Sequence, residues 1–357
     1  MQLDMTKGRP MPIILKFFVP IFIGNMFQQF YNMVDSIIVG RYVGEEAFAA
    51  VGSTGTIMFL VLGFANGLST GFTVLTSQKF GAKDEKGIRQ SVSNAIILSV
   101  IVSVVMTIIS VLSMGALLHL MNTPKNIYHY AYDYIIIITG GTAAVCFYNL
   151  FSALLRAVGN SKAPLFFLIL SAVLNIFLDL LFIIRFRWEV QGAAIATIAS
   201  QAISAVCCLF YILAKVKILV PHRDEWKING HYAKKQLAVG FPMALQFGIT
   251  ASGTLIMQSA INRFGSTAIA GFNASSKVGN LLTQAFPALG QSMATYTGQN
   301  FGKRDIDRIN RGSHVAIVIS AIASALGLVL GLVLLKPAIP LFLGSNVDMN
   351  AILPWAK

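Results

Sequence analysis

Two acidic residues, Asp35 and Asp179, lie inside runs of the chain that are otherwise almost wholly apolar. Asn175 precedes Asp179 by one helical turn in the run SAVLNIFLDLLFII, so the two side chains share a helix face. A charged side chain at the centre of a membrane-spanning helix costs roughly 2.5 to 3.5 kcal/mol. Acids in such positions therefore indicate function. Because desolvation and mutual repulsion favour their neutral form, a pair could store a proton, or bind a monovalent cation when ionised.

The composition indicates that lipid surrounds these acids. Hydrophobic residues make up 55% of the 357 residues, charged residues only 11%, and the mean hydropathy is +0.70, outside the range of soluble globular proteins. A helix needs about 20 apolar residues to cross a hydrocarbon core of about 30 Å. Because backbone groups must be satisfied in lipid, the sequence predicts an all-α, polytopic membrane bundle. The nine predicted spans are 12–39, 52–75, 92–118, 131–155, 164–184, 192–213, 237–261, 274–297 and 314–335.

The distribution of Lys and Arg predicts the topology. The N-terminus and every second loop after it hold 19 of the 27 basic residues, whereas the opposite loops hold 7. The positive-inside rule therefore predicts a multi-pass protein of the cell membrane with a cytoplasmic N-terminus. Topology explains the net charge of +13, so we expect no nucleic-acid partner. The cysteines and histidines have no ligand spacing, and we expect neither a metal site, beyond possible sodium, nor a cofactor.

An internal repeat predicts two lobes. A shift of 221 residues lays TSQKFGAKDEKGI at 76–88 on TGQNFGKRDIDRI at 297–309. Six spans separate the copies, so the halves share one orientation and are related by an axis along the membrane normal. We expect an N-lobe at 1–215 with helices 1–6, a cytoplasmic linker at 216–236, and a partial C-lobe at 237–357 with helices 7–9 and an outer tail. Twelve helices are expected from the repeat, which leaves a fragment, a truncated gene or a partner chain as alternatives.

Depth groups the polar residues of the first lobe. Asp35 lies six residues before Arg41, Asp179 six before Arg185, and Thr197 six after Gln191, so all three are about 9 Å below the same surface. They can form one site, with Asn175 one turn below Asp179. The alternative is that Asn175 and Asp179 are structural hydrogen-bonding residues between helices. No acid occupies the equivalent stretch of the seventh span, which favours a dedicated site in the first lobe.

Several segments together resemble the multidrug and toxic compound extrusion (MATE) family. They are PIFIGNMFQQFYNMVDSIIVGRYVGEEAFAAVG, the paired SQKFGA and GQNFGK loops, LLRAVGNSKAPL and NIFLD. The resemblance implies two six-helix lobes around a central cavity. It also implies export of cationic, amphipathic small molecules in exchange for protons or sodium ions by alternating access. A full-length member is expected to be a monomer whose other partner is the lipid bilayer.

The resemblance also implies roles for individual residues. The cation-coupling site of the first lobe falls on Asp35, Asn175, Asp179 and Thr197, and Tyr31 matches a tyrosine near it. Gln28 matches a residue of the substrate cavity. Pro20 matches a proline where the first helix is proposed to bend, although a fixed kink is the alternative.

Three other functions are weighed against drug export. An intramembrane aspartyl protease also uses two acids, but Asp179 follows NIFL instead of a GxGD context, so we expect no enzyme. A lipid-linked oligosaccharide flippase of the same superfamily would line its cavity with cations, whereas this first lobe shows acids. An inactive fragment that retains the site is the third. The natural substrate, the choice between proton and sodium, and the role of Lys277 stay open.

Overall fold

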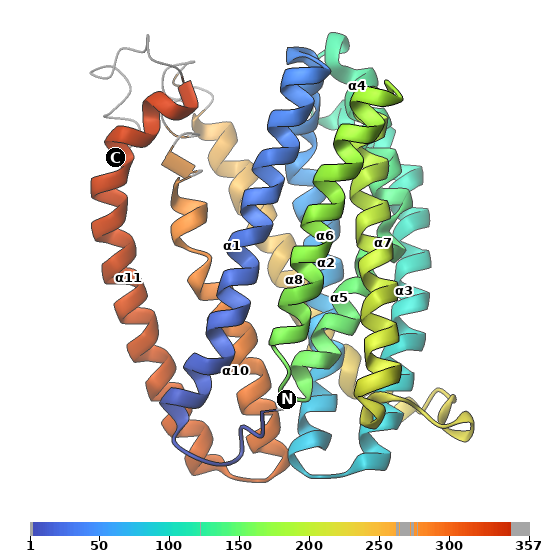
Figure 1. Cartoon of the computed structure of the whole chain (residues 1–357), viewed down its shortest axis with the longest axis vertical. Helices are drawn as coiled ribbons and strands as arrows, with labels where there is room; N and C mark the ends of the chain where they lie inside the picture. Colours follow the sequence, from blue (N-terminus) through green and yellow to red (C-terminus); the bar gives the residue numbers. More distant parts are fainter. Residues whose placement is uncertain are drawn as a thin grey trace.

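The computed structural model describes residues 3–121, 123–261, 264, 272, 275–276 and 278–343, and every regular element among them is a helix (Figure 1). The long helices are α1 (Pro10–Tyr42), α2 (Glu45–Gly81), α3 (Glu85–Leu120), α4 (Lys125–Gly140), α5 (Thr142–Ala157), α6 (Lys162–Asp179), α7 (Glu189–Lys215), α8 (Gly230–Ile261), α10 (Ala285–Gly302) and α11 (Ile306–Leu343). Shorter turns are η1 (Leu180–Arg185), η2 (Lys217–Leu219) and η3 (Arg223–Glu225). Lys277 and the tail from 344 onward lie outside the described residues.

Length and apolarity qualify six of the described helices to cross a membrane, or seven when α4 and α5 count as one bent span. These seven coincide with predicted spans one to six and nine. Predicted spans seven and eight fall on α8 and α10, which do not pass the same test over the described residues. α8 nevertheless has 32 residues, or about 48 Å at 1.5 Å per residue. It begins at Gly230, before the predicted start at 237. Of span eight, residues 274 and 277 lie outside the described residues.

The fourth span is broken, although the sequence predicted one continuous helix over 131–155. α4 and α5 meet at Gly140 and Gly141 with a bend of 47°. Paired glycines are a common cause of such kinks. The side chain of Ile198 in α7 packs into the break, where a Cβ on Gly141 would lie 2.5 Å from it. The missing side chain at Gly141 therefore lets α7 approach.

The fifth span also departs from a regular helix, because α6 ends at Asp179 and continues as the π-helix η1. A π-helical turn widens the ring of backbone hydrogen bonds and frequently marks a functional site. Asp179 lies at the junction of the two geometries. The apolar run at 164–184 predicted the span, but after Pro164 at its start it contains no glycine or proline that would signal the change.

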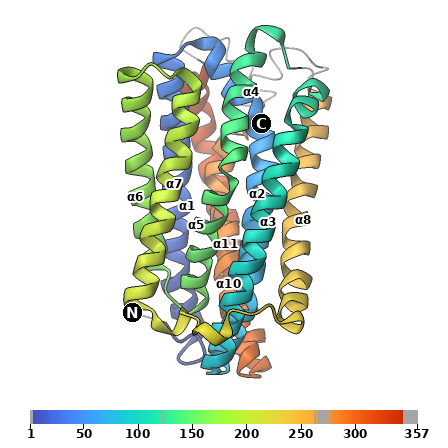
Figure 2. The ribbon, with the colours of Figure 1, turned by 90° about the vertical axis from the view of Figure 1, so that its right-hand side faces the viewer.

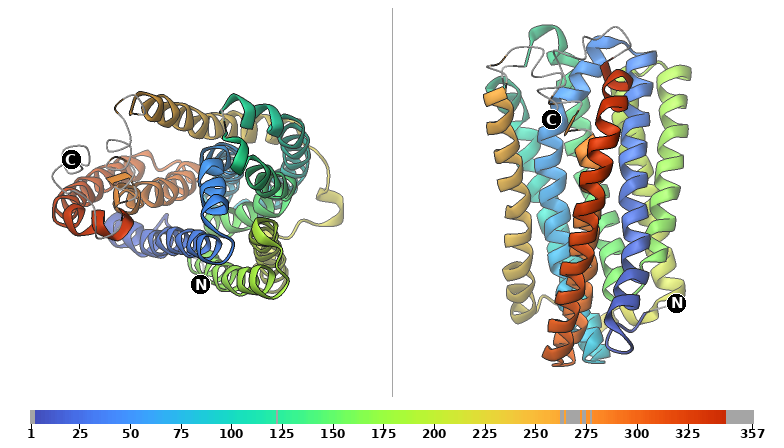
Figure 3. Two further views of the ribbon diagram at one scale, coloured as in Figure 1. Left: turned by 90° about the horizontal axis from the view of Figure 1, so that it is seen from above. Right: turned by 90° about the vertical axis from the view of Figure 1, so that its left-hand side faces the viewer.

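α2 is the central helix of the bundle and packs against α1, α3, α4, α5, α8 and α10. Figure 2 shows α6 and α7 along one edge and α8 along the opposite edge. Gly67 and Gly71 allow α2 to approach α8, since a Cβ on Gly71 would lie 2.2 Å from the Cα of Gly240. α11 lies at another edge, where it contacts α10 and α1, and most of its apolar side chains are exposed (Figure 3).

Four of the segments that carry the basic excess gather at one end of the bundle. The residues before α1, the α2–α3 turn, the α7–α8 connection and the α10–α11 turn all lie there (Figure 1). Residues 3–8 are held against the second copy of the repeat: the backbone N–H of Met5 donates to Gln299 Oε1 at 2.9 Å, and Arg308 Nε donates to the carbonyl oxygen of Met5 at 3.1 Å. Met5 is fully buried.

Residues that the repeat pairs with each other also meet in space. Gly81 at the end of α2 lies against Gln299 of α10, and Gly302 at the end of α10 lies against Gln78 of α2. A Cβ on either glycine would be 1.8 Å from the opposite glutamine's carbonyl oxygen. Gln78 and Gln299, like Gly81 and Gly302, are separated by the repeat offset of 221. Such a reciprocal contact is what a two-fold relation between two copies produces.

A nearly buried ion pair joins the α7–α8 connection to α3, and its loss is expected to lower the stability of the protein. Arg89 Nε lies 2.9 Å from Glu225 Oε2, and the two side chains are 18% and 4% exposed. We expect Glu225→Gln to destabilise the protein by about 2 to 3 kcal/mol, because it leaves a mostly buried guanidinium without its charge partner. The melting temperature of the detergent-solubilised protein measures this.

Glu85→Gln is the matched control for Glu225→Gln. Glu85 also faces Arg89, at 3.9 Å, but its side chain is 72% exposed. An exposed pair of this kind contributes about 0 to 1 kcal/mol. Equal losses of melting temperature in the two variants would contradict a special role for Glu225.

Candidate functional site

The two acids of the first lobe are brought together by the packing of α1 against α6, η1 and α7. Asp35 on α1 is 7% exposed and Asp179 at the end of α6 is fully buried. Their carboxyl groups lie within hydrogen-bonding range of each other. When both are ionised neither can donate, and two negative charges face each other in a low-dielectric interior. A shared proton would let one carboxyl group donate to the other.

Asn175 and Thr197 complete the group that the depth argument predicted. Asn175 lies one turn before Asp179 on α6 and is 1% exposed. Its Nδ2 donates to the hydroxyl oxygen of Thr197 on α7 at 3.4 Å. The Asn175 side chain therefore uses its amide nitrogen to bind α7, and its amide oxygen has no hydrogen-bond partner. Side chains from α1, α6 and α7 thus converge on one buried volume.

The unusual property of this volume is its excess of acceptors. Five buried oxygen atoms on four residues have no hydrogen-bond donor, namely Asp35 Oδ1, Asn175 Oδ1, Asp179 Oδ1, Asp179 Oδ2 and Gln201 Oε1. Buried polar atoms are normally satisfied, so a cluster of unsatisfied acceptors is a candidate site for a cation or a proton. Carboxylate, amide and hydroxyl oxygens are hard ligands that suit Na⁺ as well as H⁺. Within the described residues, no three His, Cys, Asp or Glu side chains form a metal-binding group.

Two further residues of this group were missed by the sequence analysis. Tyr134 on α4 is 2% exposed and lies close enough to Asp35 and Asp179 to experience their charge. Gln201 on α7 is buried one turn after Thr197. Its four-residue spacing from Thr197 in an apolar helix was a usable signal. Tyr134 carried no such signal, because nothing in the sequence places α4 against α7 or brings Tyr134 into one cluster with Ile38 and Ile183.

The remaining predicted residues lie along α1. Tyr31, one turn before Asp35, is close to both acids. Gln28 is exposed. Pro20 lies inside α1, which continues through it. On the far side of Pro20 from the acids, Ile14 and Phe17 pack in a cluster with residues of α10 and α11. Ile21, which follows Pro20, belongs to the same cluster. The structure therefore brings Tyr31 to the acids and leaves Pro20 near the outer end of the stretch of α1 that packs on α10 and α11.

A polytopic helical bundle with duplicated segments and buried, unpartnered acids on its helices has the construction of a secondary membrane transporter. The MatE family model matches residues 20–181 and 242–357. The chain belongs to the MatE family, as the resemblance to multidrug and toxic compound extrusion proteins indicated, and this is a family of transporters, not enzymes.

Two relatives and one solved structure show how far the likeness extends. The chain is 31% identical over 301 residues to the probable multidrug resistance protein YpnP of Bacillus subtilis, covering 84% of this chain and 67% of that protein. It is 26% identical to the probable multidrug resistance protein YoeA of the same organism, covering 92% and 72%. An outward-facing multidrug resistance MATE family transporter of the MOP superfamily superposes with a TM-score of 0.92 at 23% identity, covering 99% of this chain and 79% of that one. This likeness confirms the predicted fold class.

Proposed function

We propose that this protein exports cationic, amphipathic compounds from the cytoplasm in exchange for protons or sodium ions, by alternating access. The relatives named as multidrug resistance proteins support the substrate class. The five unpartnered buried oxygen atoms around Asp35 and Asp179 support the exchange, and this is the observation on which the proposal depends. A site with surplus acceptors favours one cation at a time, so a coupling ion and an organic cation compete for it.

The lobe assignment is part of this proposal. Residues 1–215 form the N-lobe, 216–236 the linker, and 237–357 belong to the C-lobe. The reciprocal contacts of Gly81 with Gln299 and of Gly302 with Gln78 support a two-fold relation between the lobes. The end at which these contacts lie carries the basic segments, which supports its assignment to the cytoplasm. In this arrangement the cytoplasmic side is closed.

The first helix links the site to the second lobe. Its outer half carries Asp35 against α6 and α7, while its cytoplasmic half packs against α10 and α11. Pro20 lies near the outer end of the inner contacts, which extend to Ile21, and a proline removes one backbone hydrogen bond of the helix. Neutralising the acids removes the repulsion between α1 and α6, and a bend at Pro20 lets the outer half respond without moving the inner half. Pro20 is therefore the proposed hinge.

Ethidium efflux tests the function. We expect cells that lack their own drug exporters to lose ethidium faster when they express this chain. Asp35→Asn is expected to return efflux to the background rate, because the amide cannot take up or release a proton. An uncoupler that abolishes efflux would identify proton exchange, and a sodium ionophore that abolishes it would identify sodium exchange. Glu45→Gln, on an exposed acid of α2, is the control. Undiminished efflux in Asp35→Asn would contradict the coupling site.

A further inference from the structure

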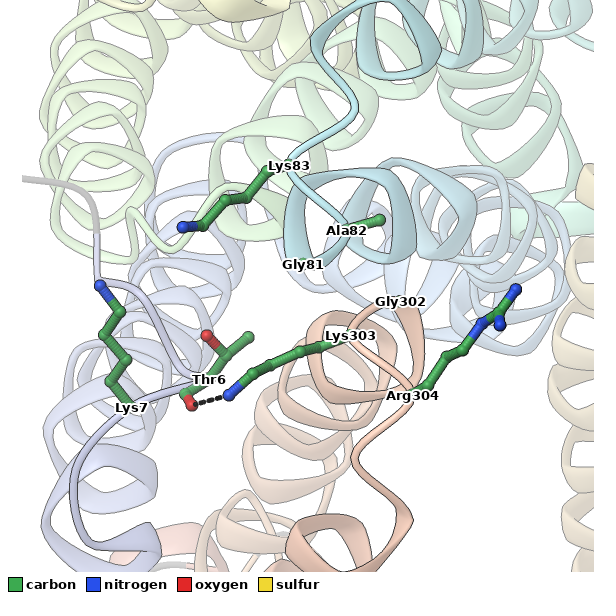
Figure 4. Close-up of a pocket in the computed structure, with 8 residues that line it drawn as sticks. All are labelled: Thr6, Lys7, Gly81, Ala82, Lys83, Gly302, Lys303 and Arg304. Atoms are coloured by element: carbon green, nitrogen blue, oxygen red, sulfur yellow. Dashed lines mark hydrogen bonds between the residues drawn. The ribbon is translucent and has the colours of Figure 1, made fainter.

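A pocket outside the carboxylate site lies where the two copies of the repeat meet. Its volume is about 310 Å³, and it is lined by Thr6, Lys7, Gly81, Ala82, Lys83, Gly302, Lys303 and Arg304. Four of these eight residues are cationic and none is acidic. Figure 4 shows that the amines of Lys7, Lys83 and Lys303 lie on one side, near Thr6, whose carbonyl oxygen accepts a hydrogen bond from Lys303 Nζ at 3.2 Å. Arg304 projects to the other side of the Gly302 turn.

Nearby acids pair with two of the four cations of this pocket. Asp4 lies 3.6 Å from Lys7, and Asp305 lies 3.8 Å from Lys303. Asp84 is engaged elsewhere: the hydrogen bond from Lys79 and the backbone N–H of Gly87 hold the pKa of its carboxyl below the usual range. Within the described part of the chain, Lys83 and Arg304 make no ion pair. The pocket therefore retains uncompensated positive charge.

The backbone at Lys83 and Arg304 gives an independent indication. The two residues occupy equivalent positions of the repeat, each just after the last turn of its helix, with φ of 58° and 64°. Glycine is the usual residue for this left-handed conformation at a helix end, because side chains there are strained. The chain has a cation at both positions. Residues kept in such conformations cluster at sites where ligands bind.

We propose that this pocket binds an anion of the phosphate class, either a phospholipid headgroup or a free phosphate. Lysine ammonium groups bind phosphate oxygens as point charges. The Thr6 hydroxyl already donates to Asp4 Oδ1 at 2.6 Å, so the cations supply the attraction. The pocket is assembled from the N-terminal segment and the ends of α2 and α10, so the anion contacts both lobes at once. Binding therefore holds the α2 and α10 ends together on the basic side of the bundle. This site goes beyond the export function and does not depend on it.

A binding measurement on the purified chain in neutral detergent tests the site. The probes are dioctanoyl phosphatidylglycerol, dioctanoyl phosphatidylcholine, and inorganic phosphate against chloride at equal ionic strength. Each is titrated while the melting temperature is followed, which yields an apparent Kd. We expect dioctanoyl phosphatidylglycerol to raise the melting temperature and the zwitterionic lipid not to. A response to inorganic phosphate as well would identify a free phosphate as ligand, and its absence would identify the lipid headgroup.

Three variants decide the location of binding. Lys83→Gln with Lys303→Gln is expected to weaken the anion about a hundredfold, or about tenfold for each ammonium removed. Lys7→Gln alone is expected to weaken it about tenfold, and its 71% exposed side chain makes it safe for folding should the double variant fail to fold. Lys234→Gln with Lys235→Gln, which removes two exposed lysines of α8, is expected to change Kd less than twofold.

Two results would overturn the proposal. In the first, no anionic probe binds the unmodified chain. In the second, the α8 control pair weakens binding as much as the pocket pair, or Lys7→Gln leaves Kd unchanged. The cations would then serve only to offset the negative ends of the α2 and α10 dipoles. Because no step of the measurement involves transport, failure of the export proposal leaves the result unaffected.

Discussion

Asp179→Asn is expected to abolish the release of protons that accompanies the binding of an organic cation. In the unmodified protein the carboxyl pair can hold a shared proton, and a cation that takes its place displaces that proton into solution. An amide at 179 cannot accept the proton, and it also removes the charge that faces Asp35. Adding ethidium to the purified protein in weakly buffered detergent measures the effect. We expect about one proton per bound cation before the change and close to none after it.

The fold is expected to survive this substitution. Asn is nearly isosteric with Asp and removes a repulsion between two buried charges, so the melting temperature should stay the same or rise. Glu45→Gln, on an exposed acid at the start of α2, is the matched control and should release protons as the unmodified protein does. Unchanged release in Asp179→Asn would show that the exchanged proton lies elsewhere. A stabilisation by sodium that Asp179→Asn removes, without any proton release, would favour sodium as the coupling ion.

Gly81→Ala is expected to separate the ends of α2 and α10. The new Cβ would lie 1.8 Å from the carbonyl oxygen of Gln299, closer than any real contact, so the two helix ends must move apart. Overpacking of this kind typically costs 1 to 3 kcal/mol, and we expect about that loss here. Ser77→Cys provides a second measurement, since Ser77 is buried beside Gly298 of α10. In a background without the native cysteines, maleimide should label Ser77→Cys faster when Gly81→Ala is present.

A second glycine of the same helix controls for the added methyl group. A Cβ on Gly52 meets nothing within 4 Å, so Gly52→Ala should be neutral or slightly stabilising through its helix propensity. Gly302→Ala should reproduce the effect of Gly81→Ala, because it has the equivalent contact with Gln78. The double variant should lose less stability than the sum of the single ones, since both relieve strain by the same separation. Maleimide labelling equal to that of Gly52→Ala would contradict the contact.

The sequence predicted well how far each polar side chain lies below the membrane surface. Charged residues mark where each span meets water, so the heights of Asp35, Asp179 and Thr197 followed from counting, and the structure brings these residues together. The repeat could also be detected in the sequence, because its two loops keep their polar residues in the same order. Both signals can be read from the sequence because each is carried by a short segment: the distance from a span end to an acid, or the order of polar residues within one copy of the repeat.

The sequence did not predict which neighbouring helix each side chain faces. Tyr134 joins the acids only because α4 packs beside them, and a neighbour across the bundle leaves no mark at residue 134. No residue type in the sequence predicts the π-helix after Asp179. The docking of residues 3–8 uses mainly backbone groups as partners, such as the Met5 carbonyl oxygen that accepts from Arg308, so its side chains give little indication of where it binds.

This docking also sets an order of events during synthesis. Met5 donates to Gln299, a residue 294 positions later in the chain. At translation rates of 5 to 20 residues per second, its partner leaves the ribosome about 15 to 60 s afterwards. Residues 3–8 are therefore fixed in place only after α10 has been made, and until then their backbone groups must be satisfied by water. Synthesis of α10 and α11 therefore also provides the binding partners that hold residues 3–8 in place.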